Sequence, residues 1–161
     1  ALITLNTNIP ATGDQQLWLE GQLKELRPRN TWLLTQYHRP LFPVVKKPGP
    51  GREAWVPLFE KYDLDLSLES DGHNIKRTLP IRNERPDPTG VVYVGEGGLG
   101  VGQRTPNPEL WYIQPPGMAS NGHHVFLLDF KAETLRSRVL MLEGGVLDDH
   151  TLKVRPKWAK K

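Results

Sequence analysis

Two short apolar runs and one amphipathic segment between them form the clearest pattern in this chain. Residues 31–35 and 64–68 have the length and composition of short buried or half-buried strands. Between them, four apolar residues recur at the i, i+3, i+4, i+7 spacing of one helical face: Trp55, Leu58, Phe59 and Tyr62. The order strand, helix, strand predicts a βαβ unit, in which the two strands lie parallel.

The same pattern predicts the elements that precede this unit. A first strand covers residues 2–5, and a helix follows from about residue 14 to residue 26. Thr12 and Gln15 stand at the spacing of a capping box, which predicts the start of this helix. Pro28 predicts its end, because proline cannot continue a helix.

The second half of the chain predicts antiparallel structure. A return strand is expected at 77–81, and a strand at 91–94 consists only of β-branched and aromatic residues. Residues 103–122 are rich in Pro, Asn and Gly and predict a loop. Three more strands with short polar turns between them predict an antiparallel meander: 125–130, 134–142 and 146–154. The fold class is therefore mixed α/β, with a parallel βαβ unit followed by a meander, in a single domain of residues 1–161.

Glycine and proline mark long ordered loops, since the chain holds 15 of each and helix interiors exclude both. Pro57 is tolerated only near a first turn, so the second helix is predicted to begin after Glu53. Residues 95–102 lack the lysine of a phosphate-binding loop and predict a turn with positive φ near the site. The loop 41–52 carries three basic residues that we expect to be solvated rather than to face an anionic substrate: Lys46, Lys47 and Arg52.

Composition narrows the classes of function. The chain has 161 residues, a formal net charge of +3 and no cysteine. The lack of cysteine excludes disulfides, thiol catalysis and thiolate metal sites. No apolar run approaches the ~20 residues that span a bilayer, and we expect no N-terminal signal sequence. We therefore expect no membrane partner, while the compartment stays open.

Polar side chains follow both strands of the predicted βαβ unit. His38 comes after the first strand, and Asp71 and His73 come after the second. Because parallel strands share one carboxyl edge, we expect these three side chains to converge. Imidazole and carboxylate groups are ligands of Zn, Fe and Mn, so the edge is a candidate metal site. An Asp-Gly turn with an incidental histidine is the alternative interpretation.

These motifs resemble those of the calcineurin-like metallophosphoesterase superfamily, and within it the purple acid phosphatase type. The first strand ends in His38-Arg39-Pro40, which matches the His-Arg-Pro motif of that family. The second ends in residues 70–77, Ser-Asp-Gly-His-Asn-Ile-Lys-Arg, which match its Gly-His-x-His-Asn-Tyr-Glu-Arg motif. The family's earlier Asp and Asn-His ligand motifs do not occur in this chain. The resemblance therefore implies the C-terminal half of a β-sandwich flanked by helices, the catalytic domain of a metallophosphoesterase, with its N-terminal half absent.

The resemblance also implies a function. The complete enzyme would be a phosphatase that hydrolyses phosphate esters with two divalent or trivalent metal ions (Fe, Mn or Zn), and the isolated chain would be inactive and bind metal weakly or not at all. His38 and His73 would be catalytic and bind metal, and Asp71 stands where the family has a further histidine ligand. Its partners would be a phosphorylated substrate and the missing N-terminal half. Three residues would contact the substrate: Arg39, Asn74 and Arg77.

Two other functions stay open. In one, Asp71 marks a decayed site, and the domain binds or assembles without catalysis. In the other, the basic residues of 153–161 and Trp158 bind nucleic acid. For that segment a frayed, solvated terminus is the expected structure.

Overall fold

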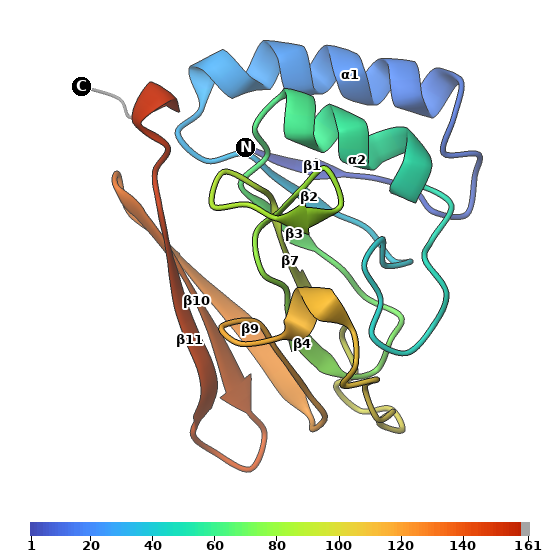
Figure 1. Ribbon diagram of the computed structural model, residues 1–161, viewed down its shortest axis with the longest axis vertical. Coiled ribbons are helices and arrows are strands. Elements are labelled where there is room, and N and C mark those ends of the chain that lie inside the picture. The colour runs from blue at the N-terminus through green and yellow to red at the C-terminus, as the bar shows by residue number, and fades with distance from the viewer. Residues whose placement is uncertain (159–161) are drawn as a thin grey trace.

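Two helices, a six-stranded mixed sheet and a three-stranded antiparallel sheet are stacked as three layers (Figure 1). The structure is a computed structural model and describes residues 1–158. The helices cover one face of the six-stranded sheet, and the three-stranded sheet packs against the other face. Each interface between layers has its own apolar core.

The parallel part of the large sheet contains the predicted βαβ unit. Its four parallel strands lie side by side in the order β1 (Leu2–Thr4), β2 (Leu34–Gln36), β3 (Leu66–Leu68) and β7 (Val92–Gly95). Helix α1 (Asp14–Leu26) connects β1 to β2, and α2 (Arg52–Lys61) connects β2 to β3. Leu34 pairs with Leu66 in parallel register, so the predicted strand order and direction are confirmed.

Antiparallel strands extend this sheet beyond β7. Strand β4 (Ile75–Arg77) pairs with β7, and β8 (Met118–Ser120) pairs with β4. The predicted return strand at 77–81 is divided between β4 and a small hairpin of β5 (Ile81–Arg82) and β6 (Arg85–Pro86). The predicted loop 103–122 also holds a short helix, η2 (Trp111–Ile113), as well as β8. Strand β8 is short and only half-buried, so it left no apolar run to detect.

The predicted meander is confirmed. It consists of β9 (His124–Phe130), β10 (Thr134–Met141) and β11 (Val146–Lys153), all antiparallel. Leu135 of β10 is fully buried against apolar residues of β2, β3 and β7. The alternation of side chains along the parallel strands supplies one apolar face to the meander and the other to the helices.

The helix layer corrects two predictions. Helix α1 begins after Gly13, which has no side chain to cap it, so the predicted capping box of Thr12 and Gln15 does not form. The Gln15 side chain instead bonds the backbone N–H and C=O of Asn6. Helix α2 begins at Arg52, and Pro57 lies inside it. Pro57 is exposed, so the helical hydrogen bond that its missing N–H cannot form is lost on the solvent side of the helix. The buried side chains of Trp55 and Phe59 pack the other side of the helix against the sheet.

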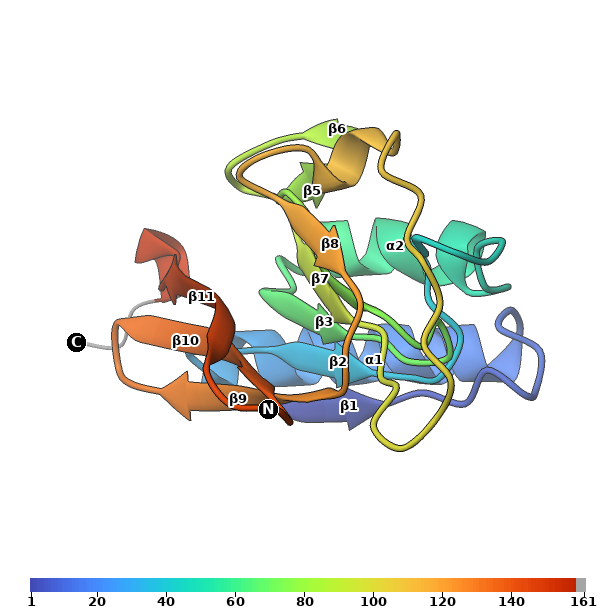
Figure 2. The same ribbon diagram turned by 90° about the horizontal axis from the view of Figure 1, so that it is seen from below.

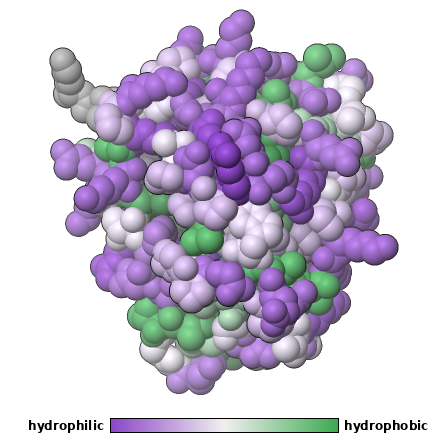
Figure 3. Space-filling view, in the orientation of Figure 1, coloured by the Kyte–Doolittle hydropathy of each residue, from purple (hydrophilic) through white to green (hydrophobic). Residues whose placement is uncertain are grey.

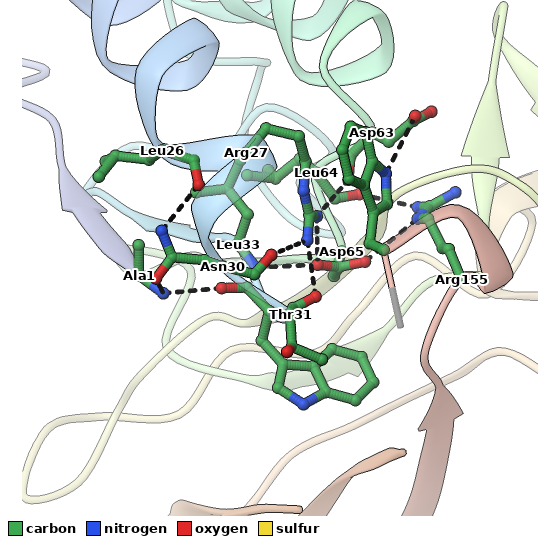
Figure 4. Close-up of polar contacts among 12 residues, drawn as sticks. Ala1, Leu26, Arg27, Asn30, Thr31, Leu33, Asp63, Leu64, Asp65 and Arg155 are labelled. Atoms are coloured by element: carbon green, nitrogen blue, oxygen red, sulfur yellow. Dashed lines mark hydrogen bonds and ion pairs between the residues drawn. The ribbon is translucent and has the colours of Figure 1, made fainter. Parts of the chain in front are cut away.

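A buried arginine joins the ends of several elements (Figure 4). Arg27 begins the short helix η1 (Arg27–Arg29), is 2% exposed and forms an ion pair of 2.8 Å with Asp65, just before β3. The same carboxylate accepts the backbone N–H of Leu33 at 2.8 Å and the Nε of Arg155 at 3.1 Å. Asp65 therefore ties the end of α1 and the starts of β2 and β3 to the C-terminal segment.

The C-terminal segment is anchored as far as it is described, which corrects the expectation of a frayed end. Besides the bond from Arg155, Lys157 pairs with Asp63 at 2.8 Å, and the Trp158 ring lies 4.8 Å from the Arg27 guanidinium. These residues include the last short helix, η3 (Pro156–Trp158). Residues 159–161 of the candidate nucleic-acid segment lie outside the described residues.

The face seen in Figure 3 is mostly hydrophilic over the helices, and apolar patches gather toward its lower part. The meander and its turns carry several exposed apolar side chains: Val125, Phe130, Leu142, Val146 and Leu147. No helix in residues 1–158 is both long enough and apolar enough to cross a membrane.

Candidate functional site

The candidate site lies where β2 and β3 end. Figure 2 shows the loops after these strands at the same end of the sheet. The backbone N–H of Ser70 donates to the carbonyl of His38 at 3.1 Å, which continues the pairing of the strands into the two loops. The Nε2 of His38 lies 3.5 Å from the Oδ1 of Asp71. The edge of the parallel sheet thus brings together an imidazole and a carboxylate from separate strands.

The turn that carries Asp71 and His73 has an unusual backbone. Asp71 has φ 70° and His73 has φ 58°, in the left-handed region that most residues avoid. Between them, a Cβ on Gly72 would lie 1.7 Å from the Oε2 of Glu96, so only glycine fits. The backbone of His73 is also held from both sides, since its N–H donates to the Glu96 carbonyl and its carbonyl accepts the Arg104 N–H. This turn is therefore fixed by the segment that follows β7.

The His73 ring has one nitrogen engaged. Its Nδ1 lies 3.1 Å from the carbonyl oxygen of Gly102. A carbonyl only accepts, so Nδ1 carries the hydrogen in this bond, and in the neutral ring Nε2 then keeps its lone pair. The predicted glycine-rich turn supplies this contact, and Gly97, Gly98 and Gly100 have the positive φ expected of it. His73 is thus oriented by the neighbouring loop with a free acceptor nitrogen.

Asp71 is surrounded by cations. The Nζ of Lys46 lies 2.5 Å from its Oδ1, and Arg104 donates to its carbonyl oxygen at 3.0 Å. Partial burial alone would raise the pKa of Asp71, but Lys46, His38 and Arg104 outweigh burial and hold the pKa below its ordinary value. Asp71 is therefore an ionised carboxylate at neutral pH.

The loop 41–52 is not the solvated basic loop that was expected. Lys46 is paired with Asp71, and Arg52 forms an ion pair of 2.5 Å with Glu84. The guanidinium of Arg52 also lies 4.3 Å from the centre of the Phe42 ring. Lys47 is exposed, as predicted.

The three predicted substrate residues are placed differently. Arg39 is exposed beside His38. Asn74 is fully buried, and neither atom of its amide has a hydrogen-bond partner among the described residues. Arg77 is 7% exposed, and Asp148 of β11 accepts from its Nε at 2.7 Å and from its Nη2 at 2.9 Å. The side chains of Asn74 and Arg77 are thus inside the protein, and only Arg39 is on the surface beside the His38–Asp71 pair.

Sequence reasoning missed a buried charge cluster under the site. Lys76 of β4, with 0% of its side chain exposed, pairs with Glu69 and, at 2.9 Å, with Glu96. Its Nζ also donates to the carbonyl of Phe42. Burial raises the pKa of Glu96, Lys76 opposes this effect, and Glu69 adds to it. The available signal was an acidic residue directly after each of two mainly apolar strands, Glu69 after β3 and Glu96 after β7.

The cluster fixes the loop that follows His38. Glu69 accepts the N–H of Leu41 at 2.6 Å, and Glu96 accepts the N–H of Val44 at 3.0 Å. The segment after His38-Arg39-Pro40 is therefore bonded to Lys76 of β4 and to the residues that directly follow β3 and β7. Because buried charges must be paired and hydrogen-bonded, this arrangement leaves the loop little freedom.

A two-metal centre does not fit the side chains of this chain alone. Within residues 1–158, no three histidine, aspartate or glutamate side chains lie close enough together to hold a metal ion. A zinc site takes three or four protein ligands, whereas His38 and Asp71 offer two donor atoms, and Lys46 already contacts one of them. Further ligands would have to come from outside the described residues.

Comparison with known proteins relates the chain to phosphatases at low identity. No family model matches it. It is 32% identical to purple acid phosphatase 21 of Arabidopsis thaliana over 92 residues, 53% of this chain and 21% of the relative. It is 30% identical to acid phosphatase A of Cryphonectria parasitica over 99 residues, 55% of this chain and 20% of the relative. The resemblance to purple acid phosphatases is thus confirmed as a distant similarity, and the match spans about a fifth of these curated relatives.

Solved structures share the fold. A purple acid phosphatase from yellow lupin (Lupinus luteus) seeds has a TM-score of 0.84 at 20% identity, over 98% of this chain and 32% of that one. GAP50, described as the anchor in the inner membrane complex of Plasmodium, has a TM-score of 0.72 at 13% identity, over 96% and 49%. The mixed α/β fold, parallel strands first and antiparallel strands after, therefore matches part of the purple acid phosphatase structure.

Proposed function

We propose that this chain is the C-terminal part of a metallophosphoesterase catalytic domain, and that the complete domain hydrolyses phosphate esters. The observation that carries the proposal is the His38–Asp71 pair, with 3.5 Å between the His38 nitrogen and the Asp71 oxygen, at the carboxyl ends of adjacent parallel strands. The distant similarity to acid phosphatases supports the same reaction class. Since the match spans only about a fifth of those relatives, the activity belongs to the complete protein.

The proposed contribution of this chain is part of a ligand set. His38 offers an exposed imidazole, Asp71 an ionised carboxylate, and His73 a nitrogen left free by its bond to Gly102. The remaining ligands to Fe, Mn or Zn would come from a preceding half of the domain. The exposed Arg39 next to His38 would face the phosphorylated substrate.

A non-catalytic domain of the same fold is the second candidate, and one contact favours it. The Lys46 ammonium lies 2.5 Å from the Asp71 oxygen, where a metal-binding carboxylate would need to be accessible. The fold itself does not separate the two functions, because both an acid phosphatase and a protein described as an anchor share it. In this second reading the Asp71–Lys46 pair would only stabilise a binding surface.

Metal content and activity of the complete protein test the proposal. The complete protein and the 161-residue chain would be purified in parallel, and bound metal and hydrolysis of p-nitrophenyl phosphate would be measured for each. We expect stoichiometric metal and turnover only in the complete protein, and loss of both in its His38→Ala variant. Lys47→Ala is the control, since Lys47 is an exposed residue near the site. A complete protein that has neither metal nor phosphatase activity would favour the non-catalytic domain.

A further inference from the structure

We propose that a strand from the part of the protein preceding Ala1 pairs with the free edge of β1 and closes an apolar groove between the two sheets. The inference rests on the proposed function, which assigns the rest of the catalytic domain to that preceding part. It identifies the surface of this chain that the preceding part covers.

Strand β1 has a free edge. It is the last strand of the six-stranded sheet and pairs only with β2 among the described residues. The N–H of Leu5, just after β1, donates to the carbonyl of Gln36 at 2.9 Å. Because backbone groups point to alternate sides along a strand, the N–H and C=O of Leu2 and Thr4 point away from β2. An edge of this kind is a ready template for another strand.

An apolar groove opens beside this edge, with a volume of about 540 Å³. Its lining is mainly apolar: Leu2, Trp32, Leu34, Leu68, Leu128 and Phe130. Trp32 and Leu34 also belong to the core between the two sheets. The core therefore continues into the groove, where Leu2 is 52% exposed and Phe130 is 53% exposed.

Both sheets end at this groove. Strand β9 is an edge of the three-stranded sheet, as β1 is of the six-stranded sheet. Leu2 of β1 and Phe130 of β9 line the same groove, and Figure 2 shows β1 and β9 on the same side of the molecule. The interior between the sheets is thus open on that side, and a strand added to β1 would cover the exposed apolar side chains.

The position of Ala1 favours the preceding part of the protein as the source of this strand. Ala1 itself lines the groove, and its nitrogen donates to the Trp32 carbonyl at 2.7 Å, in continuation of the pairing between β1 and β2. A backbone N–H in a longer chain can donate in the same way, so a preceding segment would enter at the free edge. A second copy of this chain would offer only its own β1, which is three residues long.

The edge and the groove define the strand that fits them. An antiparallel neighbour of β1 needs a connection of only about two to five residues. Its backbone would bond to Leu2 and Thr4, and every second side chain would face the groove. Because the lining is mainly apolar, those side chains are apolar, and their burial against Leu2 and Phe130 stabilises the complete domain.

Hydrogen exchange at single amides, measured in the complete protein and in the 161-residue chain, tests the pairing. We expect the Thr4 amide to exchange at least about tenfold more slowly in the complete protein, which corresponds to about 1.4 kcal/mol. The Leu5 amide is the internal control, because it already donates to Gln36 and should be protected in both proteins.

Two serine substitutions on β9 test the groove. Phe130→Ser should lower the urea midpoint of the complete protein and change that of the 161-residue chain much less, because the added strand buries the exposed part of Phe130. The matched control is Leu127→Ser, since Leu127 is 39% exposed and lies on the opposite face of the same strand. This control should have the same small effect in both proteins.

Three results would overturn the proposal: a Thr4 amide that exchanges equally fast in both proteins, equal losses of stability in the complete protein from Phe130→Ser and Leu127→Ser, or Thr4 protection in the 161-residue chain that rises with its concentration. The last result would assign the edge to a second copy of this chain. The proposed function is judged separately, by phosphatase activity of the complete protein. Thr4 protection in a complete protein without phosphatase activity would therefore support the docking surface and contradict the function.

Discussion

Lys76→Met tests the buried cluster that holds the candidate site together. The Lys76 ammonium is 0% exposed, pairs with Glu69 and Glu96, and donates to the Phe42 carbonyl. Methionine keeps most of the side-chain volume but leaves two buried carboxylates with no cation among the described residues of the cluster. Breaking a buried ion pair from one side typically costs about 3–5 kcal/mol.

The loss should be visible in thermal unfolding. For a domain of this size, 1 kcal/mol corresponds to about 2–4 °C in Tm, so we expect a Tm lower by about 6–20 °C in Lys76→Met. The matched control is Lys46→Met, which breaks a pair whose lysine is 37% exposed and should cost no more than about 1 kcal/mol. The assay is far-UV circular dichroism during heating and during urea titration.

Glu96 gives this prediction a pH signature. Burial raises its pKa above the ordinary 4.5, Lys76 opposes the rise, and Glu69 adds to it. A carboxyl whose pKa is raised in the folded state stabilises the fold fully below its unfolded pKa, and this contribution is lost as pH rises through the folded pKa. Without Lys76 the folded pKa rises further. The difference in unfolding free energy between wild type and Lys76→Met should therefore shrink as the pH falls from neutral toward 4.5.

Two results would refute this reasoning. One is a Lys76→Met protein that is no less stable than Lys46→Met. The other is a stability deficit that does not change with pH, because the loss would then come from packing and not from unpaired carboxylates.

Three further changes have defined outcomes. Gly72→Ala should lower the urea midpoint of unfolding, because its Cβ would lie 1.7 Å from the Oε2 of Glu96. The control Gly21→Ala places its Cβ with nothing within 4 Å and should raise the free energy of unfolding by up to ~1 kcal/mol. A Gly72→Ala protein as stable as wild type would contradict the described turn. Arg27→Met breaks a buried ion pair and should lower the free energy of unfolding by about 3 kcal/mol or more. Arg29→Met breaks an exposed pair and should lower it by less than about 0.5 kcal/mol. Equal losses of the two variants in urea titrations would argue against the buried network. Asp71→Ala in the complete protein should lower metal content and phosphatase rate together, and retention of both would make Asp71 only a turn residue.

The hydrophobic pattern was sufficient for the parallel core and the meander. Successive side chains of β2, β3 and β10 point to opposite faces of a sheet, and the buried faces carry apolar residues. This leaves a pattern of apolar positions that the sequence shows directly. Strand β8 escaped detection because it is only three half-buried residues long and lies in a segment rich in Pro, Asn and Gly. The strand forms because it pairs with β4, and the two segments lie so far apart in the sequence that no local pattern predicts their pairing.

The site could be predicted in its position but not in its contacts. The rule that parallel strands share an edge placed His38 next to Asp71. Arg77 was predicted to face the substrate, but it alternates with Lys76 along β4 and points to the meander, where it pairs with Asp148. The pairing of Lys46 with Asp71 depends on the path of a loop across 25 residues, which residue spacing cannot give.

X-ray diffraction from crystals of the complete protein, grown with Mn²⁺ or Zn²⁺ and measured at the absorption edge of the metal, tests the central claim most directly. The account predicts an anomalous peak within bonding distance, about 2.0–2.2 Å, of the His38 Nε2 and of an Asp71 carboxylate oxygen. A well-ordered site with no anomalous peak there would contradict it.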